Sequence, residues 1–160
     1  LTFVRVGSLV PMRWDELDYK NDLWTIPAIR MKGKKEHLVP LTSQIKRLLD
    51  YIRQFNGEED YVFWSPRNKA RPHINESALN NHLKVGLGYG GKQTAHGLRQ
   101  LPLTAGQDVL DFPPDIIQRQ MAHAIGDKIR MAYDKSQQLE ERRMFMDAWC
   151  DALVSHGLKV

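Results

Sequence analysis

The sequence predicts an α+β domain that is mainly helical and carries a small antiparallel sheet of about three strands. Two observations support this prediction. Strand-like residues are confined to the stretch from Trp14 to Pro40, whereas later segments repeat apolar residues at helical spacing. Capping residues such as Thr42 and Thr94 precede those helical segments. At 160 residues, the chain is long enough for one domain with a buried core.

The composition indicates a soluble globular protein, because 42% of the residues are hydrophobic and 26% are charged. No apolar run approaches the length of a membrane span, and there is no signal-peptide pattern. The sequence has a single cysteine, Cys150, which excludes an internal disulfide and suits a reducing cytosol. We expect Cys150 to be a packing residue on a C-terminal helix rather than a nucleophile.

The sheet is predicted from two β-favouring runs. Residues 23–26 follow a turn signal at residues 20–22, and residues 37–39 end at Pro40. The loop between the two runs carries four basic residues within six positions: Arg30, Lys32, Lys34 and Lys35.

The net charge of +4 belongs to the first half of the chain. Residues 1–72 carry 13 Lys and Arg against 9 acidic residues, and the remainder carries 10 of each. The basic loop supplies much of this surplus. Such a loop can be a solvated turn or a surface that binds nucleic acid, and its composition leaves both open.

Five helices are expected after the sheet. They begin after Thr42, at Asn75 or Ser77, after Thr94 and at Pro113-Pro114, and the last spans about residues 139–154. Residues 61–64 are predicted to form a short buried strand or extended segment. The last helix carries an apolar stripe, which either packs on its own domain or docks on a neighbouring protomer.

Polar motifs in the second half are candidates for a functional site. His96 and Arg99 follow Thr94 and lie three positions apart, so they share one face near a helix start. The free N–H groups there, Arg99 and the imidazoles of His96 and His123 together suit a bound phosphate. Tyr133 follows ten residues after His123 and could supply an oxygen nucleophile. Taken singly, a chance helical pair and a packed tyrosine are the more common explanations of these residues.

The order of these residues resembles that of tyrosine recombinases, and most closely the catalytic domain of prophage and genomic-island integrases. The residues in order are Arg5, Lys32, His96, Arg99, His123 and Tyr133. The resemblance extends to sequence blocks at residues 23–27, 30–32, 37–41, 61–63, 112–115 and 122–128, so it covers nearly the whole chain.

This resemblance implies a reaction in which Tyr133 attacks a phosphodiester, giving a covalent 3′-phosphotyrosine and a free 5′-hydroxyl. His96 would manage the proton of Tyr133, and Lys32 would protonate the leaving 5′-oxygen. We favour Lys32 over its basic neighbours from its eight-residue distance to Pro40. Three residues would stabilise charge on the phosphorus transition state: Arg5, Arg99 and His123.

The implied partner is double-stranded DNA at attachment sites, bound by a homo-oligomer in the bacterial cytoplasm, where it would be associated with the nucleoid. No membrane association is expected. Arginines and lysine supply the positive charge, so the resemblance implies no metal and no other cofactor. Seven further basic residues are expected to contact DNA: Arg30, Lys34, Lys35, Arg67, Lys69, Lys128 and Arg130.

Two features depart from the family pattern. Ser8 occupies a position that is usually Glu, whose carboxylate helps to hold the structure around Arg5. Pro102 lies inside the helix of Arg99 and clashes with the carbonyl of Leu98, so we expect a kink or an early break just after Arg99. Two alternatives therefore stay open: an integrase remnant that binds DNA without cleaving it, and a type IB topoisomerase-like DNA relaxer.

The first residues of the chain are apolar, and no capping residue precedes them. This pattern looks like the tail of a helix, with Arg5 in the bend that leaves it. The resemblance implies that DNA-binding domains and the first part of the catalytic domain precede this point. We therefore interpret residues 1–160 as a fragment of an integrase catalytic domain.

Overall fold

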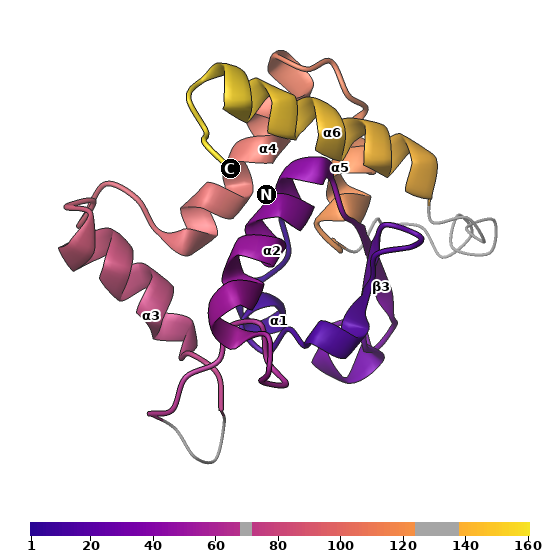
Figure 1. The fold of residues 1–160 in the computed structure, drawn as a ribbon. Coiled ribbons are helices and arrows are strands. Elements are labelled where there is room, and N and C mark those ends of the chain that lie inside the picture. Colours follow the sequence, from indigo (N-terminus) through magenta and orange to yellow (C-terminus); the bar gives the residue numbers. More distant parts are fainter. Residues whose placement is uncertain (68–71, 124–137) are drawn as a thin grey trace.

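The structure is a computed structural model, and it describes residues 1–67, 72–123 and 138–160. These residues form mainly helices and one three-stranded antiparallel sheet, which confirms the predicted α+β class. In chain order the elements are α1 (Val6–Leu9), η1 (Trp14–Glu16), β1 (Leu17–Asp18), β2 (Leu23–Ile26), η2 (Ala28–Arg30), β3 (His37–Pro40), α2 (Ser43–Asn56), α3 (Glu76–Asn81), η3 (His82–Gly86), α4 (Ala95–Asp108), α5 (Pro114–Gln120) and α6 (Leu139–Ser155) (Figure 1).

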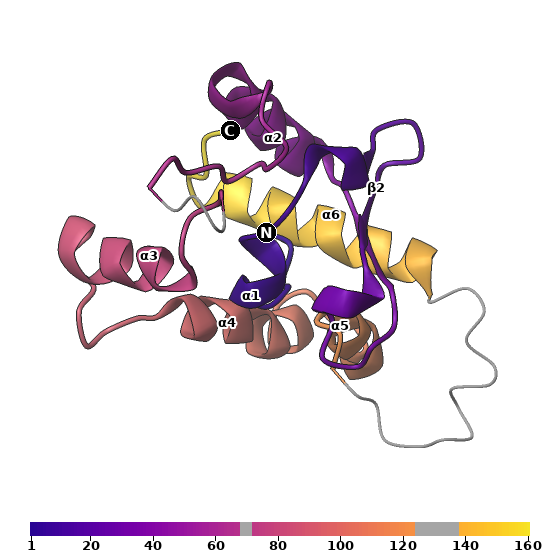
Figure 2. The same cartoon turned by 90° about the horizontal axis from the view of Figure 1, so that it is seen from below.

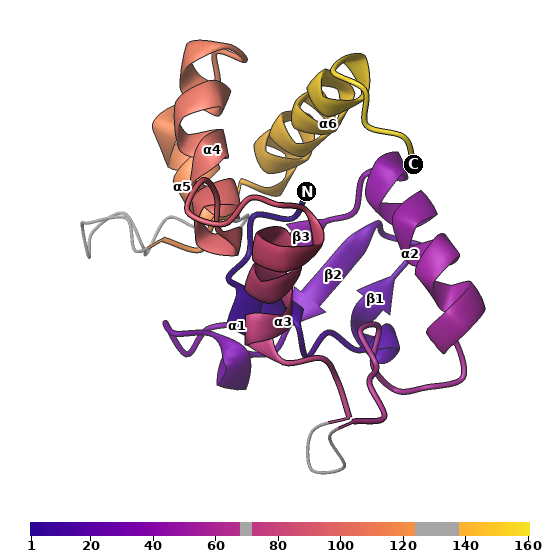
Figure 3. The same cartoon turned by 90° about the vertical axis from the view of Figure 1, so that its left-hand side faces the viewer.

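The sheet has the order β1-β2-β3, and both pairs of neighbouring strands are antiparallel (Figure 3). Trp24 on β2 is paired with Val39 on β3, and both side chains are fully buried. Ile26 is also fully buried, whereas Thr25 between them is only half-buried. This alternation is typical of a strand with one face on the core. The two predicted β-favouring runs are therefore the two longer strands of the sheet.

Helix α6 closes the core. Phe145 is fully buried, and the centroid of its ring lies 5.6 Å from that of Phe3 and 5.3 Å from that of Phe112. Trp149 adds an edge contact to Phe3 at 5.3 Å. Met146 is also fully buried. Of the two arrangements left open for the C-terminal helix, the structure shows packing on its own domain, against α4, α5 and β3 (Figure 1).

Helix α4 continues through Pro102, so the early break predicted in this helix is wrong. Packing holds the helix on both sides of the proline. Pro102 is itself buried, and Gly106 lies so close to α5 and α6 that an added Cβ would stand 2.8 Å from Ile117 and 3.0 Å from Phe145. These contacts outweigh the hydrogen bond that Pro102 cannot donate.

The N-terminal segment is not the tail of a helix, contrary to the sequence-based expectation. Residues 1–5 have no helical structure, and Arg5 is the extended N-cap of α1 rather than a bend after a helix. Phe3 has a positive φ of 57°, and Phe3 and Val4 are both buried in the core. The apolar residues that resemble a helix tail are therefore core anchors of an irregular segment.

Candidate active site

An open cleft of about 700 Å³ gathers residues from separate parts of the chain. Its lining residues belong to α1, the loop between β2 and β3, α3 and the first turns of α4. The backbones of these elements can be followed in Figure 2. Arg5, Lys32, His96 and Arg99 all line it, as does one acidic residue, Glu76. Four of the predicted catalytic residues thus share one basic cleft.

Arg99 is placed by the start of α4, where the Thr94 side chain caps the helix by accepting a backbone hydrogen bond at 2.9 Å. Arg99 is only 6% exposed. Its Nε donates to the Phe3 carbonyl at 2.7 Å, and its Nη2 donates to the Met121 carbonyl. Burial, followed by the nearby charge of Arg5, lowers the pKa of Arg99 to about 10. The guanidinium therefore stays charged at neutral pH, held by carbonyls of two distant segments.

His123 follows α5 and lies against Arg99. The chain reaches it through Ala122, which has a left-handed φ of 51°. His123 Nε2 is 3.1 Å from Arg99 Nη1, and because an arginine only donates, this ring nitrogen accepts. Burial lowers the pKa of His123, and the charges of Arg99, Arg5 and His96 lower it further. The imidazole is thus held neutral, with its proton on Nδ1.

Arg5 and His96 complete this cluster. Arg5 Nη1 donates to the Ala122 carbonyl at 3.4 Å, next to His123 in the chain. His96 is exposed and lines the cleft one turn before Arg99. Three segments that are distant in sequence therefore bring together four of the predicted residues.

Lys32 reaches the cleft from the loop between β2 and β3, where the sequence places it. It is exposed, as are Lys34 and Lys35 in the same loop. Arg67 is exposed on another loop. These side chains are accessible to a large ligand such as DNA.

Arg30 differs from its basic neighbours, because its side chain is only 15% exposed and forms an ion pair with Glu16. Sequence reasoning did not identify this pair, nor the buried hydroxyl of Ser8, which donates to the Arg30 carbonyl at 3.3 Å. It also missed Glu76, whose Oε1 would stand 3.1 Å from a Cβ added to Gly7. Because position 8 lacks the usual carboxylate, another acidic residue could have been expected near Arg5. No sequence pattern, however, distinguishes Glu16 or Glu76 from the other acidic residues.

Four predicted site residues lie outside the described residues: Lys69, Lys128, Arg130 and Tyr133. Within residues 1–67, 72–123 and 138–160, no three His, Cys, Asp or Glu side chains gather into a group that could bind a metal. In the same part of the chain, no helix combines the length and the apolar composition needed to cross a bilayer.

The cleft has the chemistry to hold an oxyanion. The guanidinium groups of Arg5 and Arg99, the imidazole of His96 and the ammonium of Lys32 line one open space, and His123 contacts Arg99. Donors that are fixed before a substrate arrives stabilise negative charge as it develops, without reorganisation. A phosphate ester is the ligand that this set of donors fits best.

Comparisons with known proteins point the same way. The profile of the phage integrase family matches residues 1–140. Prophage integrase IntA of Escherichia coli (strain K12) is 37% identical over 151 residues, which cover 94% of this chain and 36% of that protein. The integrase of Enterobacteria phage P4 is 34% identical over 168 residues, covering 96% of this chain and 38% of the phage protein. The chain thus spans well under half the length of these relatives.

A solved structure supports the fold. The crystal structure of XerA recombinase superposes with a TM-score of 0.57 at 20% identity, covering 99% of this chain and 55% of the recombinase. At that identity the similarity shows the fold alone. Because the family profile matches residues 1–140 and the relatives align over nearly the whole chain, this chain belongs to the phage integrase family.

Proposed function

We propose that this chain is the catalytic part of a site-specific DNA recombinase, which cleaves and rejoins double-stranded DNA through a covalent 3′-phosphotyrosine. The observation that supports this most strongly is that Arg5, Lys32, His96 and Arg99 line one cleft, where His123 contacts Arg99. Family membership adds to it.

In the proposed reaction, the Tyr133 oxygen attacks the scissile phosphorus while the bond from phosphorus to the 5′-oxygen breaks. His96 takes the tyrosine proton, and Lys32 gives a proton to the departing 5′-oxygen. Religation runs the same steps in reverse. The phosphotyrosine ester keeps the energy of the broken phosphodiester, so religation needs no nucleotide cofactor. The role of His96 is consistent with its exposed place at the cleft.

Arg5, Arg99 and His123 act on the phosphate oxygens. A guanidinium offers paired donors and keeps its charge at any physiological pH, so it suits nonbridging oxygens. His123 contributes as a neutral donor through Nδ1, because its Nε2 accepts from Arg99. Losing one such preorganised donor typically costs about 3–4 kcal/mol of transition-state stabilisation.

DNA is held around the cleft by the exposed basic side chains. Lys34, Lys35 and Arg67 are exposed in the structure, and Lys69, Lys128 and Arg130 are assigned by resemblance alone. We propose further that the chain works within a longer protein with upstream DNA-binding domains, as a homo-oligomer on attachment sites. The greater length of the relatives supports this. Binding should weaken steeply with salt, because phosphate contacts dominate it.

A covalent-trapping assay tests the proposal. This chain and its Tyr133→Phe variant are incubated with nicked duplex DNA that carries the end sequence of the host element. A denaturing gel then reports protein linked to DNA. We expect an adduct with the unchanged chain and none with Tyr133→Phe; an adduct that survives this substitution would place the nucleophile elsewhere.

The same assay decides between the alternatives. The substitution of Ser8 for the usual glutamate favours a remnant that binds DNA without cutting it. A folded, DNA-binding protein that gives no adduct, either alone or with its upstream domains, would support that alternative. Relaxation of supercoiled DNA without sequence preference would instead indicate a topoisomerase-like enzyme.

A further inference from the structure

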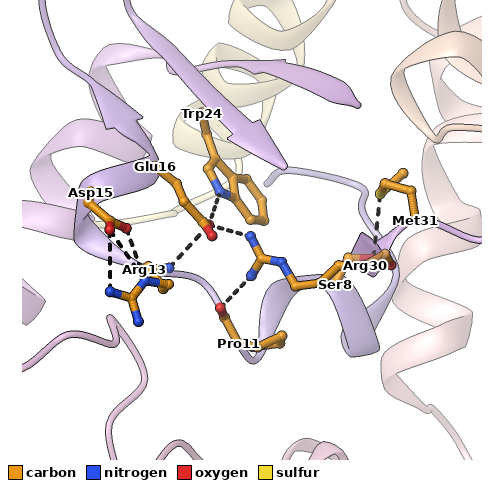
Figure 4. A network of polar contacts seen from close by, with 8 residues as sticks. All are labelled: Ser8, Pro11, Arg13, Asp15, Glu16, Trp24, Arg30 and Met31. Atoms are coloured by element: carbon orange, nitrogen blue, oxygen red, sulfur yellow. Dashed lines mark hydrogen bonds and ion pairs between the residues drawn. The ribbon is translucent and has the colours of Figure 1, made fainter. Parts of the chain in front are cut away.

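Arg30 carries the contacts of an internal residue, although it belongs to the basic loop. Its Nη2 forms an ion pair with Glu16 Oε2, as a charge contact rather than an aligned hydrogen bond, and its Nη1 donates to the Pro11 carbonyl (Figure 4). The side chain is 15% exposed, whereas Lys32 two positions later is exposed. The guanidinium thus points into the domain and is occupied there.

The carboxylate of Glu16 is fixed from several sides. It accepts from the indole Nε1 of Trp24 at 3.0 Å and from the backbone N–H of Arg13 at 3.2 Å (Figure 4). Its side chain is 9% exposed, and Trp24 is fully buried on β2. A buried carboxylate that contacts three partners is fixed in one orientation. Arg30 is therefore held in place by Glu16, which is itself bonded to Trp24 of β2.

A second contact joins the same loop to α1. The Ser8 hydroxyl donates to the Arg30 carbonyl at 3.3 Å and lies 3.7 Å from the sulfur of Met31. Pro11, which accepts from the Arg30 guanidinium, follows α1 in the chain. Both the backbone and the side chain of Arg30 are therefore attached to the segment that Arg5 begins.

We propose that Arg30 and Glu16 are positioning residues for the general acid, and that Arg30 does not contact DNA. This inference rests on the proposed function, because it assigns the pair to the loop that presents Lys32. Lys32 has a long flexible side chain in an exposed loop, so its reach depends on how firmly the base of that loop is held. The pair fixes that base to Glu16, while the Ser8 hydroxyl attaches the Arg30 backbone to α1.

Arginine suits this role better than lysine. Its planar fork offers separate nitrogens to the Glu16 carboxylate and the Pro11 carbonyl, whereas an ammonium is a single point charge. Arg30 thus links Glu16 to Ser8 and Pro11, which follow Arg5 in the chain.

The test compares Arg30→Met and Glu16→Gln with Glu36→Gln, an exposed control in the same loop. Adduct formation is measured on ordinary DNA and on DNA with sulfur in place of the bridging 5′-oxygen at the cleavage site. A thiolate leaves without being protonated, so the sulfur substrate does not need the general acid. We expect both variants of the pair to lose about tenfold to a hundredfold on ordinary DNA, and to recover most of it with sulfur.

Binding separates positioning from DNA contact. The slope of log affinity against log salt should be unchanged in Arg30→Met, whereas Lys34→Met should reduce its magnitude by about one. The indole N–H signal of Trp24 in a nitrogen-15 NMR spectrum should move in Glu16→Gln while other signals stay, which shows that the variant is folded.

Two results would overturn the proposal: an Arg30→Met defect that sulfur does not relieve, or a reduced salt slope in that variant. If the unchanged chain gives no adduct on either substrate, either alone or with its upstream domains, the proposed recombinase function fails instead. In that event the salt slope still decides whether Arg30 contacts DNA, so the two failures are distinguishable.

Discussion

The wall of the cleft formed by the first turns of α4, which contacts the turn after α5 through Arg99, differs from the β2–β3 loop in how its charges are held. On the wall, Arg99 is buried, bonded to two carbonyls and in contact with His123. In the loop, Lys32 is exposed and only the base at Arg30 is fixed. In the proposed reaction, the charge that stabilises the transition state thus lies on a residue fixed by hydrogen bonds, whereas the charge that delivers a proton lies on an exposed side chain.

The largest expected effect is on the wall. Arg99→Lys keeps a positive charge but cannot reach the Phe3 carbonyl, the Met121 carbonyl and His123 together. We expect about a thousandfold loss of adduct formation and a clear loss of thermal stability. Arg47→Lys, at an exposed position, is the matched control. Retention of both properties in Arg99→Lys would remove the distinction between wall and loop.

The stability of the domain should depend on pH because of the buried residue His37. His37 Nε2 lies 3.1 Å from the Gln120 carbonyl, and burial, followed by the charge of Arg142, lowers the pKa of His37 to about 4. The unfolded chain binds this proton near its model value of 6.5, so stability is lost as pH falls from about 6.5 to about 4. The loss attributable to His37 is about 3 kcal/mol of unfolding free energy.

Urea denaturation between pH 7 and pH 4 measures this effect. In His37→Gln the decline over that window should be shallower than in the unchanged chain, because the group that gains the proton is gone. Parallel declines in the two proteins would show that His37 is not buried in its neutral form.

Substitution of Lys32 in the loop should reduce activity but leave stability almost unchanged. Lys32→Ala is expected to reduce adduct formation about a hundredfold and to change the unfolding free energy by less than about 0.5 kcal/mol. Lys35→Ala, three positions along the same exposed loop, is the control for general loss of charge. Equal defects in the two variants would identify the loop as an electrostatic surface without a specific acid.

The smallest expected effect concerns the contact between α1 and the loop. Ser8→Ala removes the donor to the Arg30 carbonyl and should cost about 1 kcal/mol of unfolding free energy by urea denaturation. Ser43→Ala, at an exposed position, should cost less than about 0.5 kcal/mol. If the two substitutions cost the same, the Ser8 hydroxyl does not hold the loop.

Local patterns predicted the fold well. The strand runs, the caps at Thr42 and Thr94 and the helix from Leu139 depend on residues close in sequence, and the structure has all of them. The prediction failed where long-range packing dominates. Pro102 predicted a break because the energy that keeps α4 continuous comes from α5 and α6, which lie outside any local window.

The candidate site divides in the same way. Resemblance and residue order located the members of the cleft, including Lys32 in its loop. They could not show that the Arg30 side chain is paired within the domain, because its partner Glu16 is separated from it in the sequence by β1 and β2. A basic residue in a basic loop is indistinguishable by sequence from its exposed neighbours until the acid that pairs with it is located. The assignment of Tyr133 as the nucleophile stays a prediction.

The hydrogen bonds of the wall join residues that are 96 positions apart for Arg99 and Phe3, and 117 positions apart for Arg5 and Ala122. Loops of that length close slowly, because their entropy must be lost before any contact is gained. During synthesis the sheet can form early, but the arginine cluster must wait until residue 123 has left the ribosome. Nascent chains and partly folded intermediates therefore lack the assembled contacts of Arg5 and Arg99.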